Sequence, residues 1–118
     1  MDYSRLLKRS VSAALTAAAL LCSTAAFAGE VTIWCWDPNF NVAIMKEAAE
    51  RYTAKHPDTT FNIVDFAKAD VEQKLQTGLA SGMTDTLPDI VLIEDYGAQK
   101  YLQSFPGSFA ALTDKIDF

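Results

Sequence analysis

Three short apolar stretches of this chain each end in a carboxylate beside an aromatic ring. The pairs are Trp36-Asp37, Asp65-Phe66 and Asp95-Tyr96. A ring offers a flat apolar surface, and an ionised carboxylate accepts hydrogen bonds at both of its oxygens. Such a surface suits a neutral, hydroxyl-rich ligand better than it suits a phosphate or an acid. The residue types therefore indicate sugar binding, provided that the three pairs lie together.

Strand patterns precede all three pairs. β-Branched and aromatic residues predict strands at 31–36 and 60–64. The stretch 89–93, in which residues 90–93 are all apolar, predicts a third strand that is covered on both faces. Because helical segments separate the strands, we expect right-handed crossovers and a small, parallel, three-stranded β-α-β-α-β layer of the α/β class.

Helical spacing of apolar residues predicts the connecting helices. We expect Asn41 to cap the first helix and Pro57 to end it. Asp70 is expected to cap the second helix, which Gly82 ends in a left-handed conformation. A short third helix is expected near 97–103. The apolar residues expected to face the core from the first two helices are Ile44, Ala48, Tyr52, Val71, Leu75 and Leu79.

The order of the strands decides which pairs are neighbours. Ligands of such sheets bind outside the carboxyl ends of the strands, where the strand order reverses. The order second, first, third places this point between the first and third strands. Asp37 and Asp95 would then face each other across a crevice, with Asp65 further out, so we rank the first two above the third.

Residues 1–28 have the pattern of a signal peptide. Three basic residues precede the apolar run 11–21, and Ala26-Phe27-Ala28 matches a signal peptidase site. The run is short for the roughly 30 Å hydrocarbon core that a membrane anchor must cross. A lipid anchor on Cys22 is the alternative, although Leu21 before it is bulky for such a site. We expect cleavage after Ala28 and a periplasmic product.

Composition limits the function of residues 29–118. Removing residues 1–28 takes one of 15 acidic and three of 10 basic residues, which leaves 14 and 7 and a formal charge of −7. An acidic chain without clustered Lys and Arg is a poor nucleic-acid binder. The one remaining cysteine, Cys35, is expected to be a small buried residue in a strand. With only His56, the chain lacks the usual zinc-ligand sets, and we expect neither a metal nor a cofactor.

The order of these motifs resembles the start of a known family. The motifs are 31–37, a long helix ending in Arg51-Tyr52, the strand 61–64, and Pro88-Asp89-Ile90-Val91. They resemble the maltose-binding-protein-like group of extracellular solute-binding proteins, which serve ABC sugar importers. The resemblance implies a two-lobed periplasmic-binding-protein fold of type II, a sugar ligand in the cleft, and ABC permease subunits as partners. By position, it implies ligand contacts from Trp36, Asp37, Asn39, Glu94, Asp95 and Tyr96.

Members of that family are several times longer than residues 29–118. We therefore expect these residues to form the first part of an N-terminal lobe, without the second lobe or the hinge. A three-stranded parallel sheet leaves the outer edges of its outer strands unpaired. We expect residues 29–118 by themselves to be marginally stable and to be unable to close over a ligand.

Other readings of the same residues stay open. Trp34 is expected to be a core residue, and Asp37 can serve as a turn residue before Pro38. Glu94 and Asp95 can instead stabilise the start of the following helix. Paired carboxylates also suit an exported glycoside-processing enzyme, and acidic strand ends suit a receiver-like signalling domain. The open position of the acids favours binding over catalysis, so we expect no catalytic residues.

Overall fold

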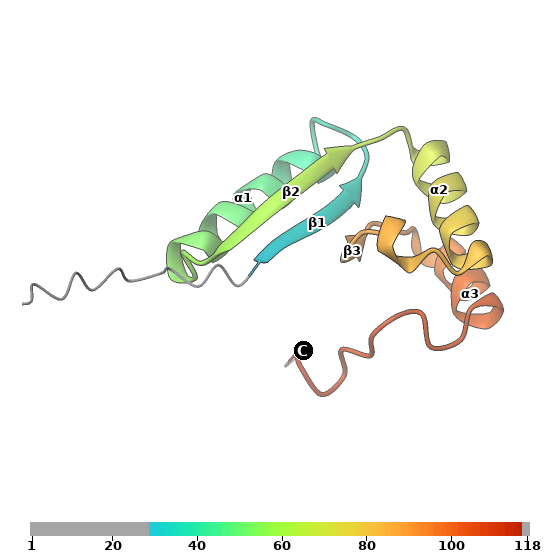
Figure 1. The fold of residues 1–118 in the computed structure, drawn as a ribbon. Coiled ribbons are helices and arrows are strands. Elements are labelled where there is room, and N and C mark those ends of the chain that lie inside the picture. Colours follow the sequence, from blue (N-terminus) through green and yellow to red (C-terminus); the bar gives the residue numbers. More distant parts are fainter. Residues whose placement is uncertain (1–28, 117–118) are drawn as a thin grey trace, which may run out of the picture.

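The computed structural model describes residues 29–116, which form a mixed α/β layer (Figure 1). The expected signal peptide, its cleavage site and Cys22 lie outside these residues. Within residues 29–116, no helix combines the length and the apolar character needed to cross a membrane. The elements are β1 (Gly29–Cys35), α1 (Asn41–Lys55), β2 (Thr59–Asp65), α2 (Lys68–Ser81), the 3-10 turn η2 (Thr84–Thr86), β3 (Ile90–Val91) and α3 (Asp95–Ser104).

The three strands form one parallel sheet in the order β2-β1-β3. β1 and β2 pair over seven residues, with Cys35 opposite Asp65 at their carboxyl ends. On its other edge β1 pairs with β3, where Trp34 lies opposite Val91. The predicted fold class, strand direction and strand order are confirmed. β1 lies in the middle of the sheet because the two crossover helices return the chain to opposite edges of this strand.

β3 is shorter than predicted. Only Ile90–Val91 is a strand, although hydrogen bonds from Asp89 N to Thr32 O (3.0 Å) and from Leu92 N to Trp34 O (2.9 Å) continue the pairing with β1. The Asp89 carboxylate also accepts a hydrogen bond from Thr32 N, at 2.8 Å. Ile90 is 47% exposed, so the expectation that both faces of this strand are covered is wrong at this residue. Among residues 29–116, no strand pairs with the outer edge of β3.

The helix starts differ from the predictions, whereas the end of α2 agrees. Phe40 is the N-cap of α1, so Asn41 is its first helical residue and does not cap it. α2 begins at Lys68, which places Asp70 in its first turn without a capping hydrogen bond. Acidic side chains in a first turn still interact favourably with the helix dipole. Gly82 ends α2 at a φ of 71°, as predicted, because this left-handed conformation is accessible to glycine at little cost.

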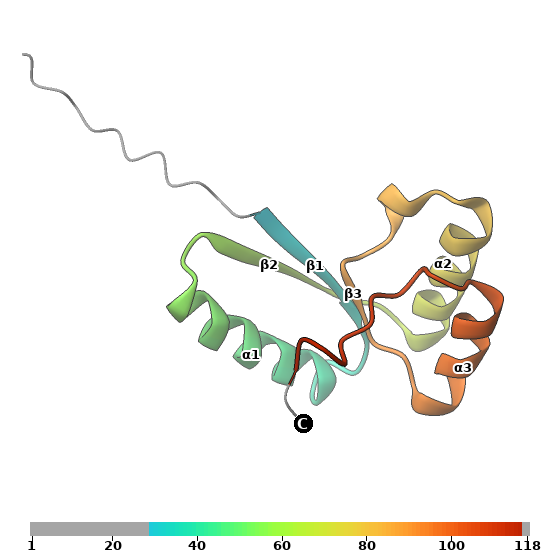
Figure 2. The same cartoon turned by 90° about the horizontal axis from the view of Figure 1, so that it is seen from below.

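Helices lie on both sides of the strands. α1 runs along one side of β1 and β2, while α2 and α3 lie on the other side (Figure 2). Cys35 is buried, as predicted. Ile44 and Tyr52, which were expected to be core residues, are 47% and 48% exposed, although the Tyr52 ring meets Phe61 of β2. The buried apolar residues are Ile33, Cys35, Val42, Val71, Leu75 and Tyr101.

Candidate functional site

The parallel strands bring the candidate residues to one edge of the sheet. We call this edge the carboxyl rim and define it as residues 36–39, 65–68 and 92–96, which lie at or directly after the ends of β1, β2 and β3 (Figure 1). Phe66 N donates a hydrogen bond to Cys35 O (3.0 Å), and Leu92 N donates one to Trp34 O (2.9 Å). The ends of the three strands are thus tied together. The β1–α1 loop leaves the sheet between the other two connections.

A lysine that the sequence analysis did not single out joins two of the candidates. Lys68 Nζ donates a hydrogen bond to the Glu94 carboxylate and another to the Tyr96 hydroxyl, at 2.7 Å. The same ammonium lies 5.3 Å from the centre of the Tyr96 ring and 3.9 Å from Glu72 Oε1. We call Lys68, Glu94 and Tyr96 the Lys68 cluster. The cluster places a donor on a rim whose candidate residues otherwise offer mainly acceptors.

The β1–α1 loop holds its candidate residues by backbone contacts. Asp37 has a φ of 64°, and its carbonyl accepts hydrogen bonds from Phe40 N (3.3 Å) and Val42 N (3.1 Å). Aspartate tolerates this left-handed conformation better than most residues do. Asp37 and Asn39 are exposed, and Trp36 is half-buried. Across residues 29–116, no side-chain hydrogen bond or ion pair links this loop to the Lys68 cluster. The backbone of Asp37 therefore makes the turn while its carboxylate faces solvent.

The other carboxylates of the rim differ in their surroundings. Asp95 Oδ1 accepts a hydrogen bond from Tyr96 N, at 2.7 Å, in the first turn of α3. Glu94 is the N-cap of α3, but its side chain binds Lys68 instead of a helix amide. Asp65 is exposed at the end of β2, opposite Cys35.

Burial raises the pKa of the Cys35 thiol. The nearby Asp65 carboxylate raises this pKa further, and the Lys46 ammonium lowers it in part.

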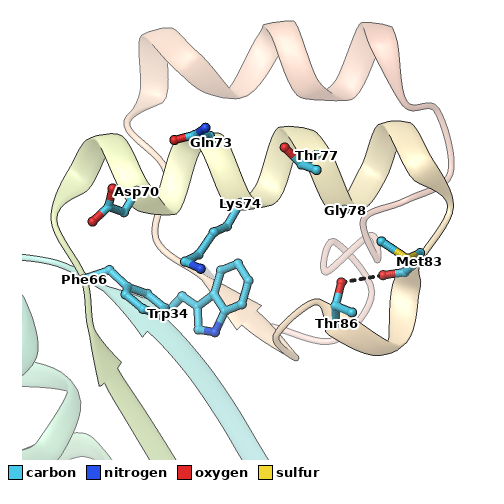
Figure 3. A pocket seen from close by; sticks show the side chains of 9 residues that line it. All are labelled: Trp34, Phe66, Asp70, Gln73, Lys74, Thr77, Gly78, Met83 and Thr86. Carbon is cyan, nitrogen blue, oxygen red and sulfur yellow. Dashed lines mark hydrogen bonds between the residues drawn. The ribbon is translucent and has the colours of Figure 1, made fainter.

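A pocket of about 570 Å³ lies beside the rim, along one side of α2 (Figure 3). Trp34 lines this pocket and is half-buried, so the expectation that it is a core residue is wrong. It meets Phe66 edge to face, with 5.5 Å between ring centres. Nζ of Lys74 lies 5.3 Å from the centre of the Phe66 ring. The residues that line the pocket are Trp34, Phe66, Asp70, Gln73, Lys74, Thr77, Gly78, Met83 and Thr86.

The signals for the missed residues were present but weak. Lys68 follows the Asp65-Phe66 pair by only a few positions, and it is the only basic residue in the three rim segments. Trp34 precedes the end of β1 by one residue, so it was assigned to the core together with the strand. The positions of the Lys68 and Trp34 side chains depend on which segments cover them, and the spacing of residues in the sequence does not show this.

The part of the chain that the structure describes has no set of side chains that could hold a metal ion. Within residues 29–116, no three His, Cys, Asp or Glu side chains are grouped as a metal site would require. The rim instead combines carboxylate acceptors, one ammonium donor and aromatic rings. These groups can hydrogen-bond hydroxyls and pack against the apolar face of a ring.

Comparisons with known proteins do not assign the chain. No model of a protein family matches it. A search of the solved structures also found no match.

Proposed function

We propose that this chain is the first part of the N-terminal lobe of the carbohydrate-binding component of an ABC importer, and that its carboxyl rim contributes to the site for a sugar or oligosaccharide. Its place of action would be the periplasm, after cleavage of the signal peptide, and its protein partners would be permease subunits. The proposal is supported by the resemblance of the motifs to sugar-binding proteins of such importers. It concerns binding without catalysis, and it needs neither a metal nor a cofactor.

The arrangement of the Lys68 cluster is the observation that carries the proposal. Lys68 holds the Glu94 carboxylate and the Tyr96 hydroxyl at the end of β3, next to the loop that bears Asp37. A sugar hydroxyl both donates and accepts hydrogen bonds, so it can bind a carboxylate and an ammonium at once. The Tyr96 ring is largely exposed and offers an apolar platform. Together these groups match the polar edge and the apolar face of a sugar ring.

The same contacts favour binding over glycoside cleavage. A glycosidase needs one carboxylic acid that stays protonated, usually because an apolar pocket surrounds it. Glu94 is half-buried and pairs with the Lys68 ammonium, and Asp95 is exposed and accepts a hydrogen bond from Tyr96 N, so neither is surrounded by an apolar pocket. Asp37 is exposed. We therefore assign these carboxylates to hydrogen bonding of hydroxyls.

Calorimetric titration of the purified 118-residue chain with neutral sugars tests the proposal. The panel is glucose, galactose, xylose, maltose and cellobiose. We expect saturable binding of at least one sugar, and a loss of at least tenfold in affinity for Asp37→Asn and for Glu94→Gln. Asp58→Asn is the matched control, since Asp58 is an exposed carboxylate that precedes β2, at the opposite end of the sheet.

Two results would contradict the proposal. One is the absence of saturable binding for every sugar of the panel. The other is an equal loss of affinity in Asp58→Asn and in the two rim variants. For the export step, N-terminal sequencing of the product secreted by a bacterial host is expected to begin at Gly29.

A further inference from the structure

Asp89 directly precedes β3 and makes two hydrogen bonds to one residue of β1. Asp89 N donates to Thr32 O at 3.0 Å, and Asp89 Oδ2 accepts from Thr32 N at 2.8 Å. We propose that Asp89 is a positioning residue of the carboxyl rim, which fixes the register of β3 against β1 and thereby holds Glu94 and Tyr96 within reach of Lys68. Its effect on sugar affinity rests on the proposed function, whereas its effect on the Lys68 cluster does not.

The Asp89 carboxylate takes the place of a backbone acceptor in the sheet. An N–H group of a central strand normally donates to a carbonyl of a neighbouring strand. Thr32 belongs to β1, the central strand, and its N–H donates to the Asp89 side chain instead. The preceding residue, Pro88, has no N–H that could add a bond to the ladder. The side chain therefore extends the pairing with β1 by one further bond at the start of β3.

Few other contacts fix the register of β3. This strand has two residues, which lie opposite Ile33 and Trp34, whereas β1 and β2 pair over seven residues. Register is strongly specified where one face of a strand is buried, but Ile90 is 47% exposed. The two bonds between Asp89 and Thr32 engage both backbone groups of a single residue. They therefore favour one register where the apolar pattern of β3 does so only weakly.

The Lys68 cluster depends on this register, because its members come from opposite edges of β1. Lys68 follows β2, whereas two residues separate the end of β3 from Glu94. A slip of one residue moves a parallel strand by about 3.3 Å and turns its side chains to the other face of the sheet. Hydrogen bonds between nitrogen and oxygen keep to about 2.7–3.2 Å. Such a slip of β3 would therefore separate Lys68 from Glu94 and from Tyr96.

Asp89 acts on the rim at a distance. Its carboxylate binds Thr32, three residues before the end of β1, whereas the rim lies after the strand ends. The role that we assign to it needs a hydrogen-bond acceptor and not a negative charge. An asparagine side chain keeps an oxygen at the same place, and an alanine side chain does not. The two substitutions therefore separate this positioning role from an effect of charge.

Nuclear magnetic resonance and calorimetry on variants of the 118-residue chain test the inference. We expect Asp89→Ala to lose the nuclear Overhauser contact between the Lys68 side chain and the Tyr96 ring, and to bind sugar at least tenfold more weakly. Asp89→Asn is expected to keep that contact and to retain the affinity within threefold. Asp85→Ala is the matched control and is expected to change neither, since Asp85 is an exposed carboxylate of η2 in the same connection.

The unmodified chain provides a measurement that no substitution disturbs. A coupling through the hydrogen bond, from the Thr32 amide nitrogen to the Asp89 carboxyl carbon, is expected in its spectra. Absence of this coupling would overturn the inference. So would an equal loss of the contact between Lys68 and Tyr96 in Asp89→Asn and Asp89→Ala, because the effect would then belong to the charge.

The stability of Asp89→Ala needs its own control, because this variant lacks a hydrogen bond of the sheet. Its spectra are recorded with trimethylamine N-oxide, which favours the folded state. An unfolded Asp89→Ala under these conditions, or a folded one in which Lys68 still contacts Tyr96, would overturn the inference. Absence of binding for every sugar would overturn the proposed function alone, because the contact between Lys68 and Tyr96 is measured without sugar.

Discussion

The two faces of β1 border hollows of opposite character. Ile33 and Trp34 are consecutive residues, so their side chains point to opposite faces of the sheet. Ile33 lines a groove of about 380 Å³ on the α1 side, where its neighbours include Met45, Phe61 and Ile90. Trp34 lines the pocket on the α2 side, whose other walls carry charged and amide side chains.

The two linings predict different effects of substitutions. Covering a groove whose lining is almost wholly apolar lowers the free energy, because apolar surface is removed from water whatever covers it. A pocket that is lined by both polar and apolar groups is stabilised only by an occupant that can hydrogen-bond to the polar groups. We therefore expect substitutions on the α1 side to change stability, and substitutions of the exposed residues of the pocket to leave stability nearly constant.

The largest expected effect follows from Ile33→Ala. Ile33 is 4% exposed, and truncating such a residue costs about 2–5 kcal/mol. Because this small sheet has an open edge at β3, we expect the variant to be largely unfolded in urea titrations followed by far-UV circular dichroism. Ile44→Ala, at an exposed position of α1, is the control and is expected to cost less than about 1 kcal/mol.

The unmodified chain gives the reference for that comparison. We expect a broad thermal transition of low midpoint, as suits a marginally stable sheet. A sharp, cooperative transition in a monomeric sample would contradict this expectation. Equal destabilisation by Ile33→Ala and Lys74→Met would remove the distinction between the two hollows.

A smaller effect is expected from Tyr52→Ala. The Tyr52 ring stacks on His56, with 4.3 Å between ring centres, and meets Phe61 edge to face at 5.7 Å. Aromatic pairs of this kind contribute about 0.5–1.5 kcal/mol beyond the area they bury. Tyr52→Phe keeps both ring contacts and is expected to retain the stability of the unmodified chain in the same urea titration. Destabilisation by Tyr52→Phe equal to that by Tyr52→Ala would assign the effect to the hydroxyl.

The Cys35 thiol makes stability depend on pH. Burial raises its pKa above the ordinary value of 9.0, so the thiol of the unfolded chain ionises first as the pH rises. Between the two pKa values the unfolded state binds fewer protons, and the free energy of unfolding decreases with increasing pH. We expect the urea midpoint to fall above pH 9 in the unmodified chain. In Cys35→Ala this decrease is expected to be smaller, and an identical slope would exclude the thiol as its source.

The smallest effect on stability is expected from Lys68→Met. The side chains of Lys68 and Glu94 are 37% and 34% exposed, and solvent screening limits such a pair to less than about 1 kcal/mol. Sugar affinity is expected to fall more clearly, because Glu94 and Tyr96 lose the group that holds them together. A loss of stability above about 2 kcal/mol, measured in urea at low and high salt, would show that the cluster belongs to the packing of the fold.

Local patterns predicted the layer well. The strand patterns at 31–36, 60–64 and 89–93, with helices between them, predicted parallel pairing, and the strand order adopted for them, β2-β1-β3, is the one observed. Gly82 was predicted as a helix end from its conformational freedom alone. These features depend on neighbours in the sequence and on the handedness of crossovers, which hold in nearly all sheets.

Two predictions about single residues were wrong. Asn41 was expected to cap α1, but the Asp37 carbonyl accepts the amides at that end of the helix. Ile90 was expected to be covered on both faces, but it lies on an edge strand. The Asn41 outcome depends on the local turn at Asp37, whereas the Ile90 outcome depends on which segments lie next to β3 in space.

The sequence by itself determined that three acidic and aromatic strand ends point the same way. Strand direction follows from the alternation of strands and helices, and alternation is written in the residue pattern. Only the tertiary structure decided that Lys68 meets Glu94, 26 residues later, and that Trp34 lines a pocket instead of the core. These contacts depend on the register of β3 against β1 and on the rotation of α2 about its axis, and no local pattern specifies either.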